Sequence, residues 1–206
     1  MLLIIDNYDS FVFNILQWLD YPADQIKVLR NDDVSLKQLT VADVEAVIIS
    51  PGPMSPGEAG YSNEAVRLFG ESGIPVLGIC LGHQCIGHVY GCVVGRHPRP
   101  AHGKEAIVEL QRSALFNGLP ERITVGRYHS LHVEMHSVDH PQLKVTATLD
   151  DGTVMALEHR HYPIYGVQFH PESVLTGAPG KTVLSNFLTI AGLKPRSKIT
   201  PAVSGF

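Results

Sequence analysis

Cysteine, tryptophan and long apolar runs are scarce in this sequence of 206 residues. It has one tryptophan and three cysteines, at positions 80, 85 and 92. Three clustered cysteines are too few for a disulfide framework, so we expect a reduced, cytoplasmic protein. The longest apolar runs, such as residues 2–5, are far shorter than the ~18 to 20 residues of a membrane span, and the basic start of a signal peptide is missing.

An excess of charge of one sign is also lacking. The 16 basic and 20 acidic residues give a net charge of −4, which argues against a protein that binds nucleic acid or an anionic membrane. The length and the 44% content of hydrophobic residues suit one compact domain. We assign this domain to residues 1–192. Residues 193–206 lack apolar periodicity, and we expect a flexible tail there.

Strands alternate with helices in the first half of the sequence. Ser10 is a candidate cap for the first helix, and the Pro- and Gly-rich residues 50–60 predict a loop. The second half is richer in strands, and Asp151-Gly152 predicts a hairpin. Strands are predicted at 2–5, 26–29, 44–50, 74–79, 106–110, 123–129, 143–149, 153–159 and 164–170, and later helices at 62–70, 81–90 and 181–191. This order predicts a three-layer α/β fold, with a mostly parallel central sheet flanked by helices and an added antiparallel region in the second half.

The sequence GICLG at 78–82 places Cys80 between two glycines, where a buried strand meets a helix. This G-x-C-x-G pattern is the nucleophile elbow with sulfur in place of oxygen. The sharp turn needs neighbours without side chains, and the helix N-terminus favours a thiolate. Backbone N–H groups of the first turn, Leu81 first, would face an oxyanion. Cys85 lies mid-helix and is expected to face the core. Taken alone, the pattern fits a tight turn around a small buried residue equally well.

A base for this nucleophile is predicted in GVQFHPES, residues 166–173. Pro171 separates His170 from Glu172 and favours an extended conformation at His170. Residues two apart in an extended chain point to the same side, so Glu172 can hold one ring nitrogen of His170 and leave the other free for sulfur. Taken alone, a histidine at a strand end beside a solvated glutamate is an equally good interpretation.

Together, six blocks make the sequence resemble the class I, triad-type glutamine amidotransferases from residue 1 to about 191. The forms of several blocks are similar to the glutaminase subunits of aminodeoxychorismate synthase and anthranilate synthase. In many members SPGP is followed by glycine, whereas Met54 stands here. This departure slightly favours the aminodeoxychorismate branch. The blocks are DNYDSF (6–11), SPGP (50–53), GICLGHQ (78–84), HGK (102–104), RYHSL (127–131) and GVQFHPES (166–173).

The resemblance implies a role for each matching residue. It implies Cys80 as nucleophile, His170 as general base and Glu172 as its orienting carboxylate. Gly52 and Leu81 match the oxyanion hole, and the positions that hold the amino-acid end of glutamine are Gly52, Gln84, Ser130 and Leu131. The implied reaction is hydrolysis of L-glutamine to glutamate without metal or organic cofactor. The ammonia would pass to a chorismate-using synthase subunit, component I, which the segment HGK is expected to contact.

The 11 histidines raise the question of zinc, but no H-E-x-x-H or paired C-x-x-C is present. His129, His132 and His136 lie in predicted strand and loop, and we expect most histidines at the surface or in loops. The aspartates of DNYDSF lack the glycines and lysine of a phosphate-binding loop, which favours a packing role. A subunit of anthranilate synthase or of both synthases, a stand-alone γ-glutamyl hydrolase and an inactive scaffold remain alternatives.

Overall fold

A nine-stranded sheet forms the centre of the protein. The computed structural model describes residues 1–138 and 141–194. The sheet contains β1 (Leu2–Asp6), β2 (Ile26–Arg30), β3 (Ala46–Ile49), β4 (Val76–Ile79), β6 (Lys104–Leu110), β7 (Arg122–Arg127), β9 (Leu143–Thr148), β10 (Val154–His159) and β11 (Ile164–Val167). The strand order is β2-β1-β3-β4-β11-β10-β9-β6-β7. The first five strands in this order are parallel, and the last four pair antiparallel, as predicted.

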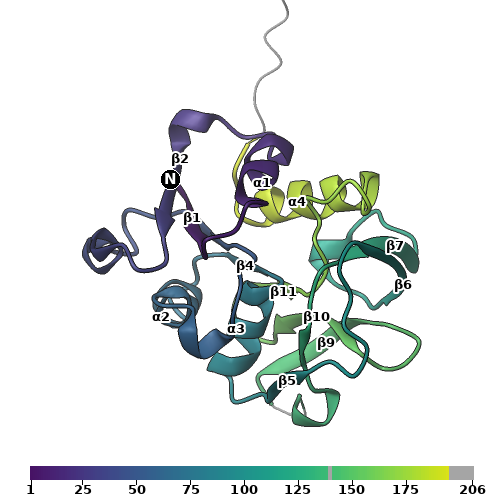
Figure 1. The fold of residues 1–206 in the computed structure, drawn as a ribbon. Helices are drawn as coiled ribbons and strands as arrows, with labels where there is room; N and C mark the ends of the chain where they lie inside the picture. Colours follow the sequence, from purple (N-terminus) through teal and green to yellow (C-terminus); the bar gives the residue numbers. More distant parts are fainter. Residues whose placement is uncertain (139–140, 195–206) are drawn as a thin grey trace, which may run out of the picture.

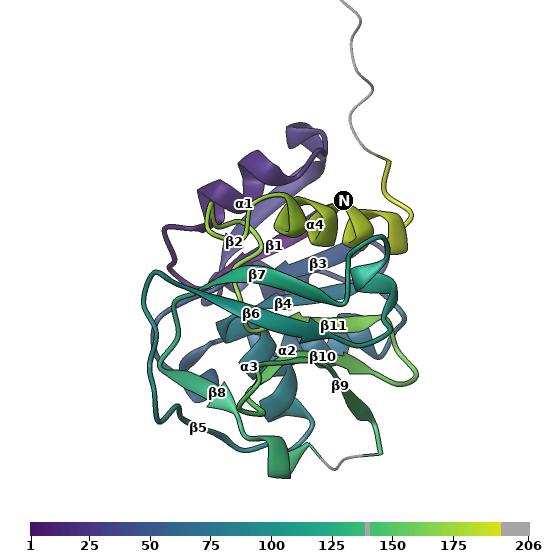
Figure 2. The ribbon, with the colours of Figure 1, turned by 90° about the vertical axis from the view of Figure 1, so that its right-hand side faces the viewer.

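Helices cover both faces of the parallel part (Figures 1 and 2). Helices α1 (Val12–Trp18) and α4 (Ala178–Ile190) cover one face, and α2 (Ser62–Ala65), its π-helical extension η4 (Val66–Gly70) and α3 (Leu81–Val89) cover the other. Successive side chains of β1 point to opposite faces of the sheet, so the protein has one hydrophobic core on each face. Leu2 and Ile4 belong to the core beneath α1 and α4, whereas Leu3 and Ile5 belong to the core beneath α2 and α3.

Short 3-10 helices and a small second sheet connect these elements. Strands β5 (Val94–Arg96) and β8 (Leu131–Val133) pair antiparallel outside the main sheet. The sequence did not predict either strand, because three residues carry too little periodicity. The 3-10 helices are η1 (Ala23–Gln25), η2 (Val34–Gln38), η3 (Pro56–Glu58), η5 (Ala114–Phe116) and η6 (Met135–Ser137).

Several element ends differ from the sequence predictions; the strand predicted at 164–170, for example, ends at Val167, and two helices begin elsewhere than expected. The predicted cap at Ser10 is wrong: α1 has Phe11 as its N-cap, and the Asp9 carboxylate accepts a hydrogen bond from the Phe11 N–H at 2.7 Å. Asp9 can reach this N–H because it lies two residues before it, in an Asx turn. Helix α4 begins at Ala178 rather than at residue 181, since Pro179 fits the first turn, where its missing N–H costs nothing. The hairpin at Asp151-Gly152 is confirmed, with Gly152 at φ +82°.

The boundary predicted at Gly192 lies close to the end of the described residues. Gly192 has φ +68°, as glycines that end helices often do. Leu193 follows it, is only 7% exposed and packs in the core beneath α4, and its N–H donates to the Leu188 carbonyl at 2.9 Å. The folded unit therefore includes Leu193. Residues 195–206 of the predicted tail lie outside the described residues.

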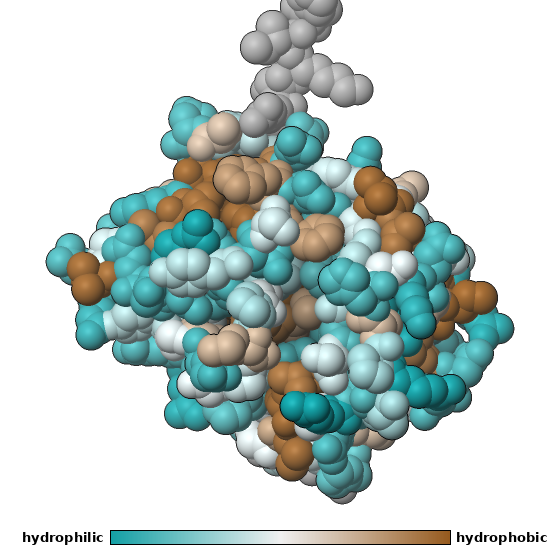
Figure 3. Space-filling view, in the orientation of Figure 1, coloured by the Kyte–Doolittle hydropathy of each residue, from teal (hydrophilic) through white to brown (hydrophobic). Residues whose placement is uncertain are grey.

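Hydrophilic residues cover most of the face seen in Figure 3, with hydrophobic residues in separate areas. Within residues 1–138 and 141–194, no helix combines the length and the apolar character that a membrane crossing requires.

Candidate active site

Cys80 lies at a strained turn between β4 and α3. Its φ of +51° and ψ of −98° are unusual for a residue with a side chain. It is the N-cap of α3 and 6% exposed, and its N–H donates to the Val167 carbonyl of β11 at 2.8 Å. The structure thus places this cysteine at an elbow, with its side chain beside the positive end of the helix.

The two glycines of the elbow are required by close packing. A Cβ atom on Gly78 would lie 2.7 Å from the backbone nitrogen of His83 and closer still to the Gly82 carbonyl group. A Cβ atom on Gly82 would lie 3.0 Å from the Ile49 Cβ and closer still to the Ile49 carbonyl oxygen. The turn is this tight because the first turn of α3 lies directly over β3 and β4.

His170 and Glu172 form a buried pair. The Nδ1 atom of His170 lies 2.7 Å from Oε1 of Glu172, and the two residues are 2% and 0% exposed. The His170 backbone is held at both ends, because its N–H donates to the Gly126 carbonyl at 3.1 Å and its carbonyl accepts from the Thr176 hydroxyl at 2.6 Å. Nε2 makes no hydrogen bond to another described residue. Glu172 therefore orients the ring through Nδ1, and Nε2 is available to exchange a proton with a reacting group.

Electrostatics keep a proton on this imidazole. Burial alone lowers the pKa of His170, but interactions with Cys80 and Glu172 outweigh it and raise that pKa well above its ordinary value. Cys80 and His170 follow the neighbouring strands β4 and β11, and Gln168, two residues before His170, lies 3.5 Å from the Cys80 sulfur. Phe11 and Tyr128 pack their rings against His170 with centroids 5.1 and 4.9 Å away. These contacts restrict the ring to the orientation that Glu172 selects.

The predicted oxyanion-hole residues lie side by side. A Cβ atom on Gly52 would lie 2.9 Å from Cδ2 of Leu81 and 2.5 Å from Cβ of Asn7. The Gly52 and Leu81 N–H groups donate no hydrogen bond to any of the described residues. An oxyanion hole requires free N–H donors of this kind, so both groups remain candidates for that role.

Asn7, in the block DNYDSF, holds the Gly52 loop in place. The Asn7 side-chain amide donates to the Ser50 carbonyl at 2.9 Å, and its N–H donates to the Ser50 hydroxyl at 2.9 Å. These contacts fit the packing role predicted for this block. Further along the loop, Met54 has φ +73°, a conformation that favours glycine, so the usual glycine after SPGP has a physical reason.

Of the predicted glutamine-binding residues, Gln84 and Leu131 are in direct contact. The Gln84 side-chain nitrogen donates to the Leu131 carbonyl at 3.1 Å and also to Oε1 of Gln168 at 3.0 Å. Ser130 is exposed, and its carbonyl accepts from the His97 N–H at 2.8 Å. Gln168 was not singled out in the sequence, yet its side-chain nitrogen lies 3.5 Å from the Cys80 sulfur. Only the register of β11 against β4 could have indicated it.

The other two cysteines are free and buried. Burial, with a smaller contribution from Cys80, raises the pKa of Cys85 to about 12. Burial also raises the pKa of Cys92. Both thiols therefore resist ionisation at neutral pH, as predicted for Cys85 from its position inside the helix.

Most of the described histidines lie at the surface or in loops, as expected, but several are buried, including His83 in α3 and His159 in β10. Buried histidines are His83, His97, His129, His159 and His170. Hydrogen bonds make burial tolerable: His97 pairs with the Thr153 hydroxyl at 2.9 Å, and His129 with the Leu131 carbonyl at 2.9 Å. Burial lowers the pKa of His129 to about 3, so it is neutral. Among residues 1–138 and 141–194, no group of three or more His, Cys, Asp or Glu side chains is placed to hold a metal ion.

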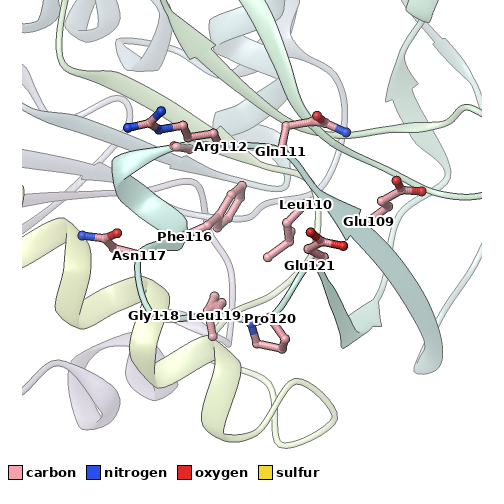
Figure 4. Close-up of a pocket in the computed structure, with 11 residues that line it drawn as sticks. Glu109, Leu110, Gln111, Arg112, Phe116, Asn117, Gly118, Leu119, Pro120 and Glu121 are labelled. Carbon is pink, nitrogen blue, oxygen red and sulfur yellow. The ribbon is translucent and has the colours of Figure 1, made fainter.

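Two cavities differ in their relation to this site. A cavity of about 490 Å³ lies at the connection between β6 and β7, where Arg112, Phe116 and Glu121 line it, and includes none of the residues predicted for the site (Figure 4). A second cavity of about 380 Å³ is lined by His102, Lys104, Tyr128 and Ser130, among others. Since Tyr128 also contacts His170, this second cavity borders the candidate active site.

Comparisons with known proteins agree with this geometry. The family model described as "Glutamine amidotransferase class-I" matches residues 3–191. The chain is 43% identical over 188 residues to an "Aminodeoxychorismate/anthranilate synthase component 2" of Bacillus subtilis, covering 91% of this chain and 95% of the relative. It is 43% identical over 197 residues to an "Anthranilate synthase component 2" of Pseudomonas putida, covering 93% and 98%.

The chain is 42% identical over 194 residues to the "Bifunctional protein TrpGD" of Thermotoga maritima, covering 93% of this chain but only 32% of that longer protein. A solved structure of a glutamine amidotransferase from Thermotoga maritima is 16% identical, covers 92% of this chain and 97% of its own, and has a TM-score of 0.71. This likeness shows the α/β fold.

Proposed function

Because the chain belongs to the class I glutamine amidotransferase family, we propose that it is the glutaminase component of a chorismate-aminating synthase. It hydrolyses L-glutamine to glutamate and passes ammonia to a component I subunit. The observation that carries the proposal is the juxtaposition of Cys80, at the elbow, with the buried His170–Glu172 pair. The component 2 names of the relatives from Bacillus subtilis and Pseudomonas putida support it.

In the proposed reaction, the Cys80 thiolate attacks the side-chain amide carbon of glutamine. The oxyanion that forms is held by the N–H groups of Gly52 and Leu81. Because the pKa of His170 is raised, its imidazole holds a proton at neutral pH and can give it to the leaving nitrogen, which departs as ammonia. A γ-glutamyl thioester remains on Cys80. The now neutral His170 takes a proton from water, the hydroxide displaces the sulfur, and glutamate leaves.

The hydrogen bonds of Gln84 indicate how the amino-acid end of glutamine is held. Both donor positions of its amide are occupied, by the Leu131 carbonyl and by Oε1 of Gln168. Only the Gln84 oxygen is then left to contact a ligand. We therefore assign it to the α-ammonium group of glutamine, together with Ser130 and Leu131 as neighbours in the same site.

The partner is proposed to dock near residues 102–104. His102 packs its ring against Tyr128 with centroids 5.6 Å apart, and Tyr128 in turn packs against His170. A subunit that binds at this segment would therefore act close to the triad. Cys80 is only 6% exposed, which suits a site that opens when the partner adjusts the Gly52 loop. We expect the isolated chain to be nearly idle and the partner to raise turnover by ~10² to 10³, the effect of one oxyanion-hole donor.

The pathway has two candidates. Met54 favours the aminodeoxychorismate branch, whereas the relative from Bacillus subtilis bears the name of both synthases, which supports a shared subunit as the alternative. The three free cysteines support a reducing compartment such as the cytoplasm.

The test is glutamate release by the isolated chain and then with a purified aminodeoxychorismate or anthranilate component I. Stimulation by one or both identifies the pathway, and the Cys80→Ala chain with the same partners is the control. Full activity of the isolated chain, unchanged by either partner, would instead favour a stand-alone γ-glutamyl hydrolase. Absence of glutamine turnover with every partner would leave the inactive-scaffold interpretation.

A further inference from the structure

Gln168 lies directly opposite Cys80 across two paired strands. The parallel register of β11 and β4 matches Gly166 with Gly78 and Val167 with Ile79, so Gln168 and Cys80 are the first residues after the two paired strand ends. Gln168 is 0% exposed, and its backbone N–H donates to the Met155 carbonyl at 2.9 Å. Strand pairing, rather than a flexible loop, therefore fixes its side chain beside the sulfur.

The direction of the Gln168 amide is determined by its neighbours. The Gln84 side chain reaches Gln168 through its nitrogen, which can only donate, so the Gln168 atom facing it must be the oxygen. The nitrogen of Gln168 then points at the Cys80 sulfur, 3.5 Å away. Reversing Gln168 would bring two NH₂ groups together, and reversing Gln84 would place its oxygen against the Leu131 carbonyl. The hydrogen bonds from Gln168 to the Cys80 sulfur and from Gln84 to Gln168 can therefore be oriented in only one way.

We propose that Gln168 holds the Cys80 sulfur as a hydrogen-bond donor and couples it to the Gln84 amide. A thiolate accepts a hydrogen bond more strongly than a thiol, particularly in a buried site. Gln168 thus offers the sulfur a neutral hydrogen-bond donor in addition to the nearby charge of His170. The contact with sulfur stands on geometry alone, whereas the coupling to substrate binding rests on the proposed function of Gln84.

Three variants test the donor. Gln168→Met removes both amide atoms at similar length, and Gln168→Glu keeps the acceptor for Gln84 but faces the sulfur with a carboxylate. Gln38→Met makes the same substitution at an exposed site and is the control. The first readout is the rate at which iodoacetamide alkylates Cys80 between pH 6 and 10, with the adduct mapped by mass spectrometry. Alkylation of Cys85 contributes little, because burial raises its pKa to about 12.

The expected result is a displaced pH profile. One hydrogen bond to an anion changes the thiolate equilibrium about tenfold, so the midpoint for Gln168→Met moves by about one pH unit to the alkaline side. The plateau rate at high pH rises about threefold, because a less stabilised thiolate is more nucleophilic. Gln168→Glu moves the midpoint further, and Gln38→Met leaves it unchanged. If Gln168 had a merely structural role, its replacement would not give both an alkaline shift of the midpoint and a higher plateau rate.

Steady-state kinetics with the activating partner separate the two halves of the proposal. Gln168→Glu lowers kcat at least tenfold with KM within about twofold, because the acceptor for Gln84 is kept. Gln168→Met lowers kcat and also raises KM. If no partner elicits glutamine turnover but the alkylation profiles shift as stated, the proposed function fails and the contact with sulfur stands.

Unchanged alkylation profiles in folded Gln168→Met and Gln168→Glu chains would overturn the proposal. If these chains do not fold, NMR spectroscopy of the unaltered protein tests the proposal instead. The side-chain amide proton resonance of Gln168 should then shift with the ionisation of Cys80 and lose that pH dependence in Cys80→Ala. A resonance that does not respond to pH in the unaltered protein would equally overturn the proposal.

Discussion

At the scale of single residues, the environment of His170 explains why three residues are needed for the chemistry. Burial alone disfavours its charged form, and Cys80 and Glu172 restore it. Removing either partner should therefore change the protonation of His170 and not merely its orientation. The proposed roles of the two partners differ, because Cys80 is proposed to react whereas Glu172 is proposed only to hold the ring.

We expect Glu172→Gln to lose stability in a pH-dependent way. A raised folded-state pKa of His170 stabilises the protein fully below about pH 6.5, the unfolded value, and this contribution is lost as pH rises through the folded pKa. In Glu172→Gln, only Cys80 still opposes the effect of burial, so the folded-state pKa of His170 is lower than in the wild type. The difference in unfolding free energy between wild type and variant should thus be larger at pH 6 than at pH 9, by more than ~0.5 kcal/mol.

Urea unfolding at the two pH values measures this difference. Glu134→Gln is the control, since Glu134 lies 3.4 Å from the exposed His136 and an exposed ion pair contributes little.

In the kinetic comparison, His170→Ala should be at least as damaging as Glu172→Ala, because His170 is proposed to carry protons in both half-reactions. A Glu172→Ala chain clearly less active than His170→Ala would show that the two roles are reversed.

At the scale of elements, the turn from β4 to α3 should tolerate no side chain at its glycines. Gly78→Ala would press its Cβ atom into the Gly82 carbonyl group and the His83 nitrogen. Since these are backbone atoms of α3, the helix would have to move, and we expect a loss of more than ~2 kcal/mol in unfolding free energy. Glutamine turnover should fall with it, because Cys80 and Leu81 move with the helix.

Gly57→Ala is the matched control for this prediction. A Cβ atom there meets only the Ser55 hydroxyl, at an ordinary 3.8 Å. Its unfolding free energy should stay within ~1 kcal/mol of wild type, as for other compatible replacements of glycine by alanine. Equal urea midpoints for the two variants would mean that the elbow is not as tightly packed as described.

The same elements show what a sequence reveals about a site. The elbow could be predicted because strand, glycines, cysteine and helix are contiguous, and the His170–Glu172 pair because two residues and a proline define it. Gln168 could not, since its role depends on the register between β4 and β11, whose residues lie 88 positions apart in the chain. The burial of His97 and His129 was not predicted, because their partners, the Thr153 hydroxyl and the Leu131 carbonyl, are contacts that no spacing reveals.

At the scale of the whole molecule, Leu193 belongs to the core beneath α4. We predict that a chain ending at Lys194 unfolds like the full chain, whereas a chain ending at Gly192 loses about 1.5 to 3 kcal/mol, the burial of one leucine side chain. It also loses the hydrogen bond from Leu193 to the Leu188 carbonyl. Both chains should retain the triad.

Urea midpoints and glutamate release of the two truncated chains, with an activating partner, check this prediction. Two chains of equal stability would show that Leu193 contributes nothing to the core. Loss of turnover in the chain ending at Lys194 would show instead that residues 195–206 take part in the reaction or in contact with the partner.

The central claim is that glutamine is hydrolysed through a thioester on Cys80, and a glutamine analogue with an electrophilic diazoketone in place of its amide tests it most directly. After incubation with the activating partner present, mass spectrometry of the digested chain should find one adduct, on Cys80. Glutamate release should fall in proportion to labelling, and Cys80→Ala should show neither labelling nor turnover. An adduct on Cys85 or Cys92, or glutamine turnover that persists in Cys80→Ala, would contradict the account.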